Sequence, residues 1–168
     1  QTRALVTTYL AYLHVSQADD GDFVNFMGYD RALLAGPRSD DCLGRAVWAL
    51  GTTFQLARDE GCRLLAREML ARALPRVRGL GPRGTAFSLL GLCAFATADP
   101  AADSVRAMLD ALAAVLVARF ADTTSDQWRW FEPTLSYDNA TIPLALFEAH
   151  LVTGNRTTLR VAREALEF

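Results

Sequence analysis

The sequence predicts an all-α fold built from antiparallel helical hairpins. Apolar residues recur at helical spacing through most of the 168 residues, and the breaks fall at clusters of Gly, Pro and Asp. The predicted helices alternate between segments that are apolar on nearly every side and segments that carry charges on one face. This alternation indicates an inner layer and an outer layer of helices.

Seven helices are predicted, at residues 3–15, 41–58, 60–73, 83–97, 100–120, 141–152 and 157–168. Residues of good N-cap type precede the second helix, and Asp99-Pro100 is expected to start the fifth, since proline fits the first turn of a helix. On the first helix, Leu5, Tyr9, Tyr12 and Leu13 share one side. The second, fourth and sixth helices form the inner layer, which predicts burial of Leu50, Phe54, Phe87, Leu90, Leu92 and Leu146.

Short turns join each inner helix to the next outer one, so each pair is expected to form an antiparallel hairpin. Two long connections, 16–40 and 121–139, each lead into the N-terminus of an inner helix. Both are therefore expected at one end of the molecule. Within the first connection, residues 22–27 are predicted to be an extended or hairpin segment.

Composition excludes several classes of function. The 17 basic residues, all of them Arg, against 19 acidic residues give a net charge of −2, so neither nucleic acid nor an anionic membrane is an expected partner. No apolar stretch approaches the roughly 20 residues that span a bilayer, and no signal peptide is indicated. We expect one cytoplasmic, bacterial domain over residues 1–168. Because the chain starts without Met, it is also expected to be part of a larger protein.

The three cysteines give no sign of a metal or cofactor. Cys42, Cys62 and Cys93 lie far apart, without a CxxC pair or clustered histidines. Free, buried thiols are expected.

The first candidate site is a stripe on the second predicted helix. Asp41, Arg45, Trp48 and Thr52 follow one another at i, i+4, i+7 and i+11. A carboxylate, a guanidinium and an indole together suit a sugar, whose ring stacks on the aromatic side chain while its hydroxyls bind the charges. The alternative is structural: an N-cap Asp, an ion pair along the helix and a packed Trp.

The second candidate site is the segment 128–139, where aromatic rings, amides and charges are densest. Its candidate residues are Trp130, Glu132, Tyr137, Asp138 and Asn139. The alternative is that Trp128, Trp130 and Phe131 simply fill the interior. Glycoside chemistry usually employs a pair of carboxylates. Asp40, Asp41, Glu132 and Asp138 are available, and we assign Asp41 and Glu132 as the candidate catalytic pair.

The same segments resemble the six-hairpin glycosidase-like superfamily, in particular (α/α) toroid regions found beside bacterial glycosyltransferase domains. The matching segments are GDFVNFM at 21–27, SDDCLGRAVWALG at 39–51, WFE at 130–132, YDNA at 137–140 and PLAL at 143–146. The resemblance implies a sugar-facing pocket at the N-terminal ends of the inner helices, carried by Asp41, Arg45, Trp48, Trp130, Glu132, Tyr137 and Asn139. A complete toroid has about twelve helices, so seven imply a partial ring.

Two functions are compatible with this pattern. The first is a carbohydrate-active domain that binds sugar, processes glycosides or serves a glycosyltransferase as an accessory; its partner is a saccharide or glycan. The second is a non-catalytic helical scaffold that binds protein. The remainder of a larger chain and a second copy are further candidate partners. Large loops at one end, and unequal helix spacing, favour a pocket and hence the first function.

Overall fold

The computed structural model describes residues 2–34 and 36–168, and this part of the chain is all-α. Helices make up 68% of it. The helices are α1 (Thr2–Ser16), α2 (Asp40–Leu56), α3 (Glu60–Ala73), the 3₁₀ helix η1 (Leu74–Val77), α4 (Pro82–Ala98), α5 (Asp103–Thr123), α6 (Thr141–Thr153) and α7 (Arg156–Glu167). The described residues form no sheet, only three isolated bridges.

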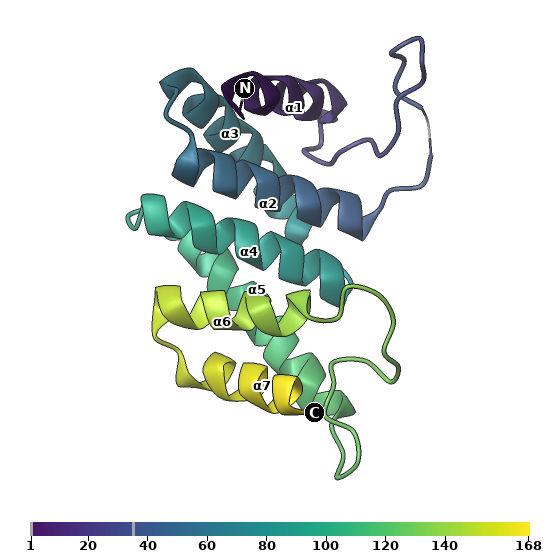
Figure 1. Ribbon diagram of the computed structural model, residues 1–168, viewed down its shortest axis with the longest axis vertical. Coiled ribbons are helices and arrows are strands. Elements are labelled where there is room, and N and C mark those ends of the chain that lie inside the picture. The colour runs from purple at the N-terminus through teal and green to yellow at the C-terminus, as the bar shows by residue number, and fades with distance from the viewer. Residues whose placement is uncertain (1, 35) are drawn as a thin grey trace.

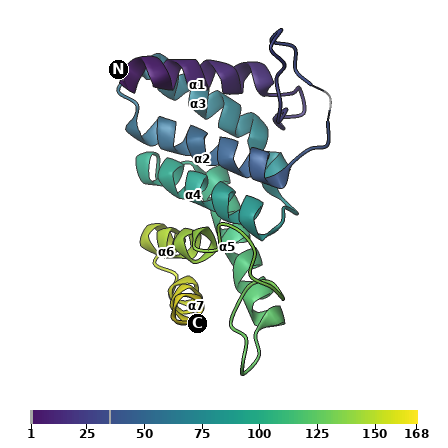
Figure 2. The same cartoon turned by 45° about the vertical axis from the view of Figure 1, so that its right-hand side comes forward.

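Helices α2, α4 and α6 lie side by side as one layer, and each packs against the helix that follows it (Figures 1 and 2). The six residues predicted to be buried on these inner helices are all buried. Helix α4, which is apolar on almost every side, is covered by neighbours along most of its length. The predicted division into inner and outer helices is therefore confirmed.

Four glycines bring α2 and α4 into backbone contact. A Cβ atom on Gly51 would lie 1.9 Å from the carbonyl oxygen of Gly91, and one on Gly44 would lie 2.6 Å from that of Gly84. Real side chains do not tolerate such distances, so the seam depends on the absence of a side chain. The contact also aligns the two N-termini, where Asp40 Oδ2 accepts a hydrogen bond from the Gly81 N–H at 2.6 Å.

One local expectation, the start of the fifth helix, is wrong. Helix α5 begins at Asp103, because the Asp99 N–H closes the end of α4 on the Phe95 carbonyl and residues 99–102 then form a turn. On α1, Leu10 is buried, whereas Leu5 and Tyr9 are exposed. The apolar side of α1 therefore exceeds what its contacts with α2 and α3 cover.

Both long loops lie at the same end of the helices, as predicted (Figure 1). In the first loop, residues 22–27 are extended and do not form a hairpin of their own. Phe23 instead bridges to Gln17, and Met27 bridges to Leu33. The turn within 27–33 is closed by a hydrogen bond from the Gly28 N–H to the Ala32 carbonyl.

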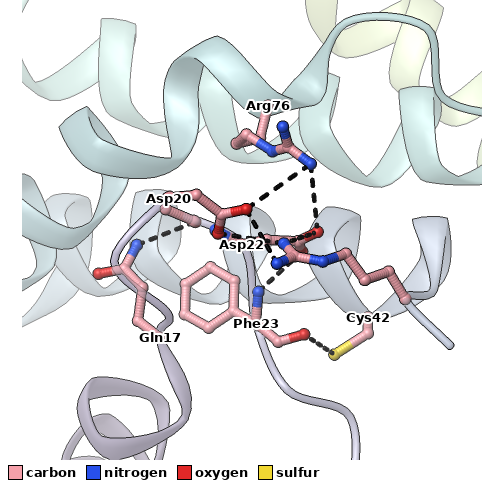
Figure 3. A network of polar contacts seen from close by, with 8 residues as sticks. Gln17, Asp20, Asp22, Phe23, Cys42 and Arg76 are labelled. Carbon is pink, nitrogen blue, oxygen red and sulfur yellow. Dashed lines mark hydrogen bonds and ion pairs between the residues drawn. The ribbon is translucent and has the colours of Figure 1, made fainter. Parts of the chain in front are cut away.

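A cluster of ionic contacts ties the first loop to the outer helices (Figure 3). Arg38 contacts Asp20 at 2.9 Å and Asp22 at 2.7 Å, and Arg76 of η1 lies 3.8 Å from Asp22. The hydrogen bond from Arg38 is the main reason that the pKa of Asp20 is lowered. Gln17 adds a hydrogen bond of 2.8 Å to the Met69 carbonyl of α3.

The three cysteines are all reduced, and they differ in burial. Cys93 is buried, Cys42 and Cys62 are partly covered, and all three are free thiols. Burial raises the pKa of Cys42 and raises that of Cys93 to about 12. Within the described residues, no group of three potential metal ligands comes together, and no helix is both long and apolar enough to span a bilayer.

Candidate functional site

An open cleft of about 500 Å³ lies at the N-terminal ends of α2 and α4, where the loop before α6 meets them. Its lining residues are Ser39, Asp40, Asp41, Gly81, Pro82, Arg83, Gly84, Glu132, Ser136 and Tyr137. Three residues singled out from the sequence, Asp41, Glu132 and Tyr137, are thus brought to one cleft from positions about 90 residues apart in the chain.

Arg83 organises this cleft. Its side chain is almost fully buried, in the first turn of α4. Nη1 contacts Glu132 Oε2 at 2.6 Å, Nη2 donates to Asn139 Oδ1 at 2.9 Å, and Nε donates to the Tyr137 carbonyl oxygen. The guanidinium also lies 4.6 Å from the centre of the Tyr137 ring. One arginine therefore holds three residues of the 124–140 loop.

Sequence reasoning missed Arg83, although a signal was present. It is the only charged residue in α4. A cation at the N-terminus of a helix is disfavoured by the helix dipole, and a buried cation needs acceptors. Those two facts predict a carboxylate or carbonyl partner from another part of the chain, which is the role that Glu132, Tyr137 and Asn139 fill.

A second set of contacts joins the loop to α2. The Tyr137 hydroxyl donates to Asp41 Oδ2 at 2.8 Å, and Arg45 Nη2 lies 3.2 Å from Asp138 Oδ2 and 3.9 Å from Asp41 Oδ2. Burial, followed by the bond to Asp41, raises the pKa of Tyr137. Asp138 also accepts a hydrogen bond of 2.6 Å from Thr141 at the start of α6. The loop is consequently fixed to three helices.

Trp48 and Trp130, the two tryptophans predicted to belong to the site, do not line this cleft. Trp130 is only 5% exposed and meets the Phe131 ring edge to face, with 5.3 Å between centres. It belongs to the core, because the aromatic first half of the segment 128–139 folds inward against α5. From the same segment, Glu132, Ser136 and Tyr137 line the cleft, whereas Asn139 contacts Arg83 without lining it. The alternative interpretation, that these rings fill the interior, is therefore correct for Trp130 and Phe131.

Trp48 lies farther along α2. It stacks on Phe87, with 5.9 Å between ring centres, and 36% of its surface remains exposed. Its exposed side faces a separate groove between α1 and α2. Arg45 stands between Trp48 and the cleft, with its guanidinium 4.2 Å from the centre of the Phe87 ring.

Some polar groups of the cleft already have structural partners. Ser39 caps α2 by accepting a hydrogen bond from the Cys42 N–H, and Asp40 accepts one from Gly81. Asp41 and Glu132 each contact a donor as well, from Tyr137 and Arg83. Each carboxylate has further lone pairs, so it can accept from a ligand while it keeps its protein partner.

Comparison with models of protein families, with curated proteins and with solved structures found no match to this chain.

Proposed function

We propose that the cleft binds a saccharide. The observation that carries the proposal is the composition of its walls: the carboxylates of Asp41 and Glu132 and the hydroxyls of Ser136 and Tyr137 border one open space. The Tyr137 ring, 55% exposed, adds an aromatic surface. Sugars present many hydroxyls around an apolar ring face, and fixed hydrogen-bond acceptors beside an aromatic ring suit that pattern.

The charge of the cleft argues for a neutral sugar or one with little charge. Asp40, Asp41 and Glu132 line it, while Arg83, the one cation among the described residues that line it, is already engaged by three loop groups. A phosphate or a polyanionic chain would meet these like charges. Arg83 would not neutralise them, because its guanidinium is already engaged. A sugar hydroxyl, in contrast, can donate to any of these carboxylates.

A more specific form of the proposal assigns chemistry to the cleft. Asp41 and Glu132 would then act as the acid and base of glycoside processing, as general acid–base catalysis requires. Without catalysis, the same groups make a sugar-binding accessory of a glycosyltransferase. Both forms require the saccharide to contact Asp41.

Binding is tested by a glycan array followed by calorimetry on the glycan that binds. We expect Asp41→Asn to weaken binding by about tenfold, because a charged acceptor is replaced by an amide that keeps the shape. Asp110→Asn, on the exposed side of α5, is the matched control and is expected to change nothing.

Product analysis with Glu132→Gln separates the two forms. The catalytic form predicts that this variant binds the glycan but no longer cleaves it. The accessory form predicts that neither the unmodified protein nor the variant cleaves the glycan. A folded, unmodified chain that binds no glycan would refute the proposal and leave the protein-binding scaffold as the better function.

A further inference from the structure

We propose that the cleft is one end of a longer binding surface, which continues along α2 into the groove between α1 and α2 and takes a linear saccharide of several rings. This inference rests on the proposed function and specifies its ligand. It starts from the exposed side of α2, which the cleft alone does not explain.

The exposed side of α2 is a straight row of chemically suitable residues. Asp41, Arg45, Trp48 and Thr52 are exposed or partly exposed, whereas Leu43, Val47, Leu50 and Phe54 on the opposite side are buried. At 1.5 Å per residue, the row from Asp41 to Thr52 extends roughly 16 Å along the helix axis. That length exceeds one sugar ring and suits a short chain of rings.

The groove at the far end of this row has a volume of about 450 Å³. Helix α1 contributes Tyr9, 66% exposed, and α2 contributes Trp48, so an aromatic ring from each helix lines it. Polar groups stand among the apolar ones: Arg45, Thr52 and Thr53. Aromatic rings with a few hydrogen-bonding groups can hold a ring that is apolar on its faces and polar at its edge.

Arg45 connects the groove to the cleft. It lines the groove, while its guanidinium reaches Asp138 and approaches Asp41, which lines the cleft. Its side chain is 53% exposed, so a ligand can reach it. Arg45 and Trp48 both rest on the buried ring of Phe87, which fixes their positions relative to each other.

The same continuity disfavours an apolar helical peptide as the occupant. A helix seated on Leu5, Tyr9 and Trp48 would run along α2 toward Arg45 and the carboxylate of Asp41. Covering those charges with apolar side chains would remove water from them without replacing its hydrogen bonds. A saccharide offers hydroxyls at both ends of the surface.

The test is calorimetry with linear oligomers of glucose, mannose and N-acetylglucosamine, from one ring to six. We expect the affinity for at least one series to rise about tenfold between one ring and three and then to level off. In Trp48→Ala and Tyr9→Ala, the ratio of trimer to monomer affinity should fall toward one. Asp41→Asn should weaken every length alike.

Tyr29→Ala is the matched control for Tyr9→Ala, since Tyr29 is exposed on the first loop and lines neither the cleft nor the groove. If Trp48→Ala unfolds the protein, Tyr9→Ala, on an exposed ring, carries the test. A length-independent affinity that both aromatic variants retain would refute the extended surface but leave the sugar-binding cleft intact. Failure of every oligomer and monomer to bind would refute both, as would capture of only an apolar helical peptide.

Discussion

The two long loops occupy equivalent places in the fold, before inner helices and at the same end, yet they are buried to different extents. The loop at 17–39 buries Phe23, but it is otherwise tied by ion pairs in which Arg38 and Asp20 are about half exposed, and it leaves Phe26 and Tyr29 in solvent. The loop at 124–140 instead inserts Trp130 and Phe131 into the core. It also surrounds the buried Arg83.

The difference shows that a loop can be attached to the protein without its side chains being held in fixed positions. Exposed ion pairs contribute little because water and salt compete for both partners. Buried rings and a buried guanidinium that donates from all three of its nitrogens fix their surroundings, because any displacement costs packing or leaves a charge unpaired. The loop that supplies Glu132, Ser136 and Tyr137 to the cleft is the one anchored by two buried rings and a buried arginine, as a site built for defined geometry requires.

The largest expected effect comes from the core of the second loop. Phe131→Ala should lower the free energy of unfolding by about 3–5 kcal/mol, because the ring is fully buried against Phe120 and Trp130. Phe26→Ala, which removes an exposed ring from the first loop, should cost less than about 0.5 kcal/mol. Urea denaturation of both variants measures the contrast, and similar losses would show that the loops are not held differently.

Removing the buried guanidinium should come next. Arg83→Met is expected to cost about 3 kcal/mol, because it leaves Glu132 and two further acceptors of the loop without their donor. Adding Glu132→Gln should recover part of the loss, since an amide tolerates the missing cation. If the loss of unfolding free energy in the double variant equalled the sum of the losses in the two single variants, the contact between Arg83 and Glu132 would not contribute to stability.

In the first loop, the one largely buried carboxylate should matter most. Asp22→Asn is expected to cost about 1.5 kcal/mol, because Asp22 accepts from Arg38 and from the Phe23 N–H and also lies near Arg76. The exposed Asp30, which accepts from the nearby Ala32 N–H, is the control, and Asp30→Asn should be close to neutral. Equal effects would mean that the Asp22 cluster does not anchor the loop.

The smallest expected effects concern pH: each loop should lose a stabilising contact at a different end of the pH range. The pKa of Asp20 is lowered, so its contribution is complete above the ordinary aspartate value of about 3.9 and is lost as the pH falls through the folded value. The pKa of Tyr137 is raised, so its contribution is complete below about 10 and is lost as the pH rises through the folded value.

Limited proteolysis across the pH range, with enzymes active at each limit, should therefore detect the first loop opening in acid and the second in alkali. Asp20→Asn should abolish the acid limit alone, and Tyr137→Phe the alkaline limit alone. Both loops opening at the same limit would contradict the assignment.

The sequence predicted the helices well because local periodicity determines them. All seven were found, and the inner residues Leu50 and Phe87 are buried as expected. The start of α5 was misplaced because proline fits a turn before a helix as readily as its first position. The choice between Pro100 and Asp103 depends on how α4 ends.

The site was predicted only in part, because its contacts join distant residues. Asp41 and Tyr137 stood out by type, but their hydrogen bond spans 96 positions. Arg83 was overlooked since its partners lie about 50 residues away, and Trp130 was misplaced because an aromatic loop can line a surface or fill a core. Chemical type suggests candidates, and tertiary packing decides which of them reach the cleft.

The glycine seam between α2 and α4 also determines where this protein can change over evolutionary time. At Gly51 and Gly91 any mutation adds atoms where the neighbouring backbone already lies, and the helices must separate to admit them. Separation would move Asp40 away from Gly81 and shift Arg83 relative to its loop. Selection should therefore hold these glycines fixed, while the exposed tip around Tyr29 can vary or lengthen. New recognition surfaces can arise at the loops of such a protein while its frame is inherited unchanged.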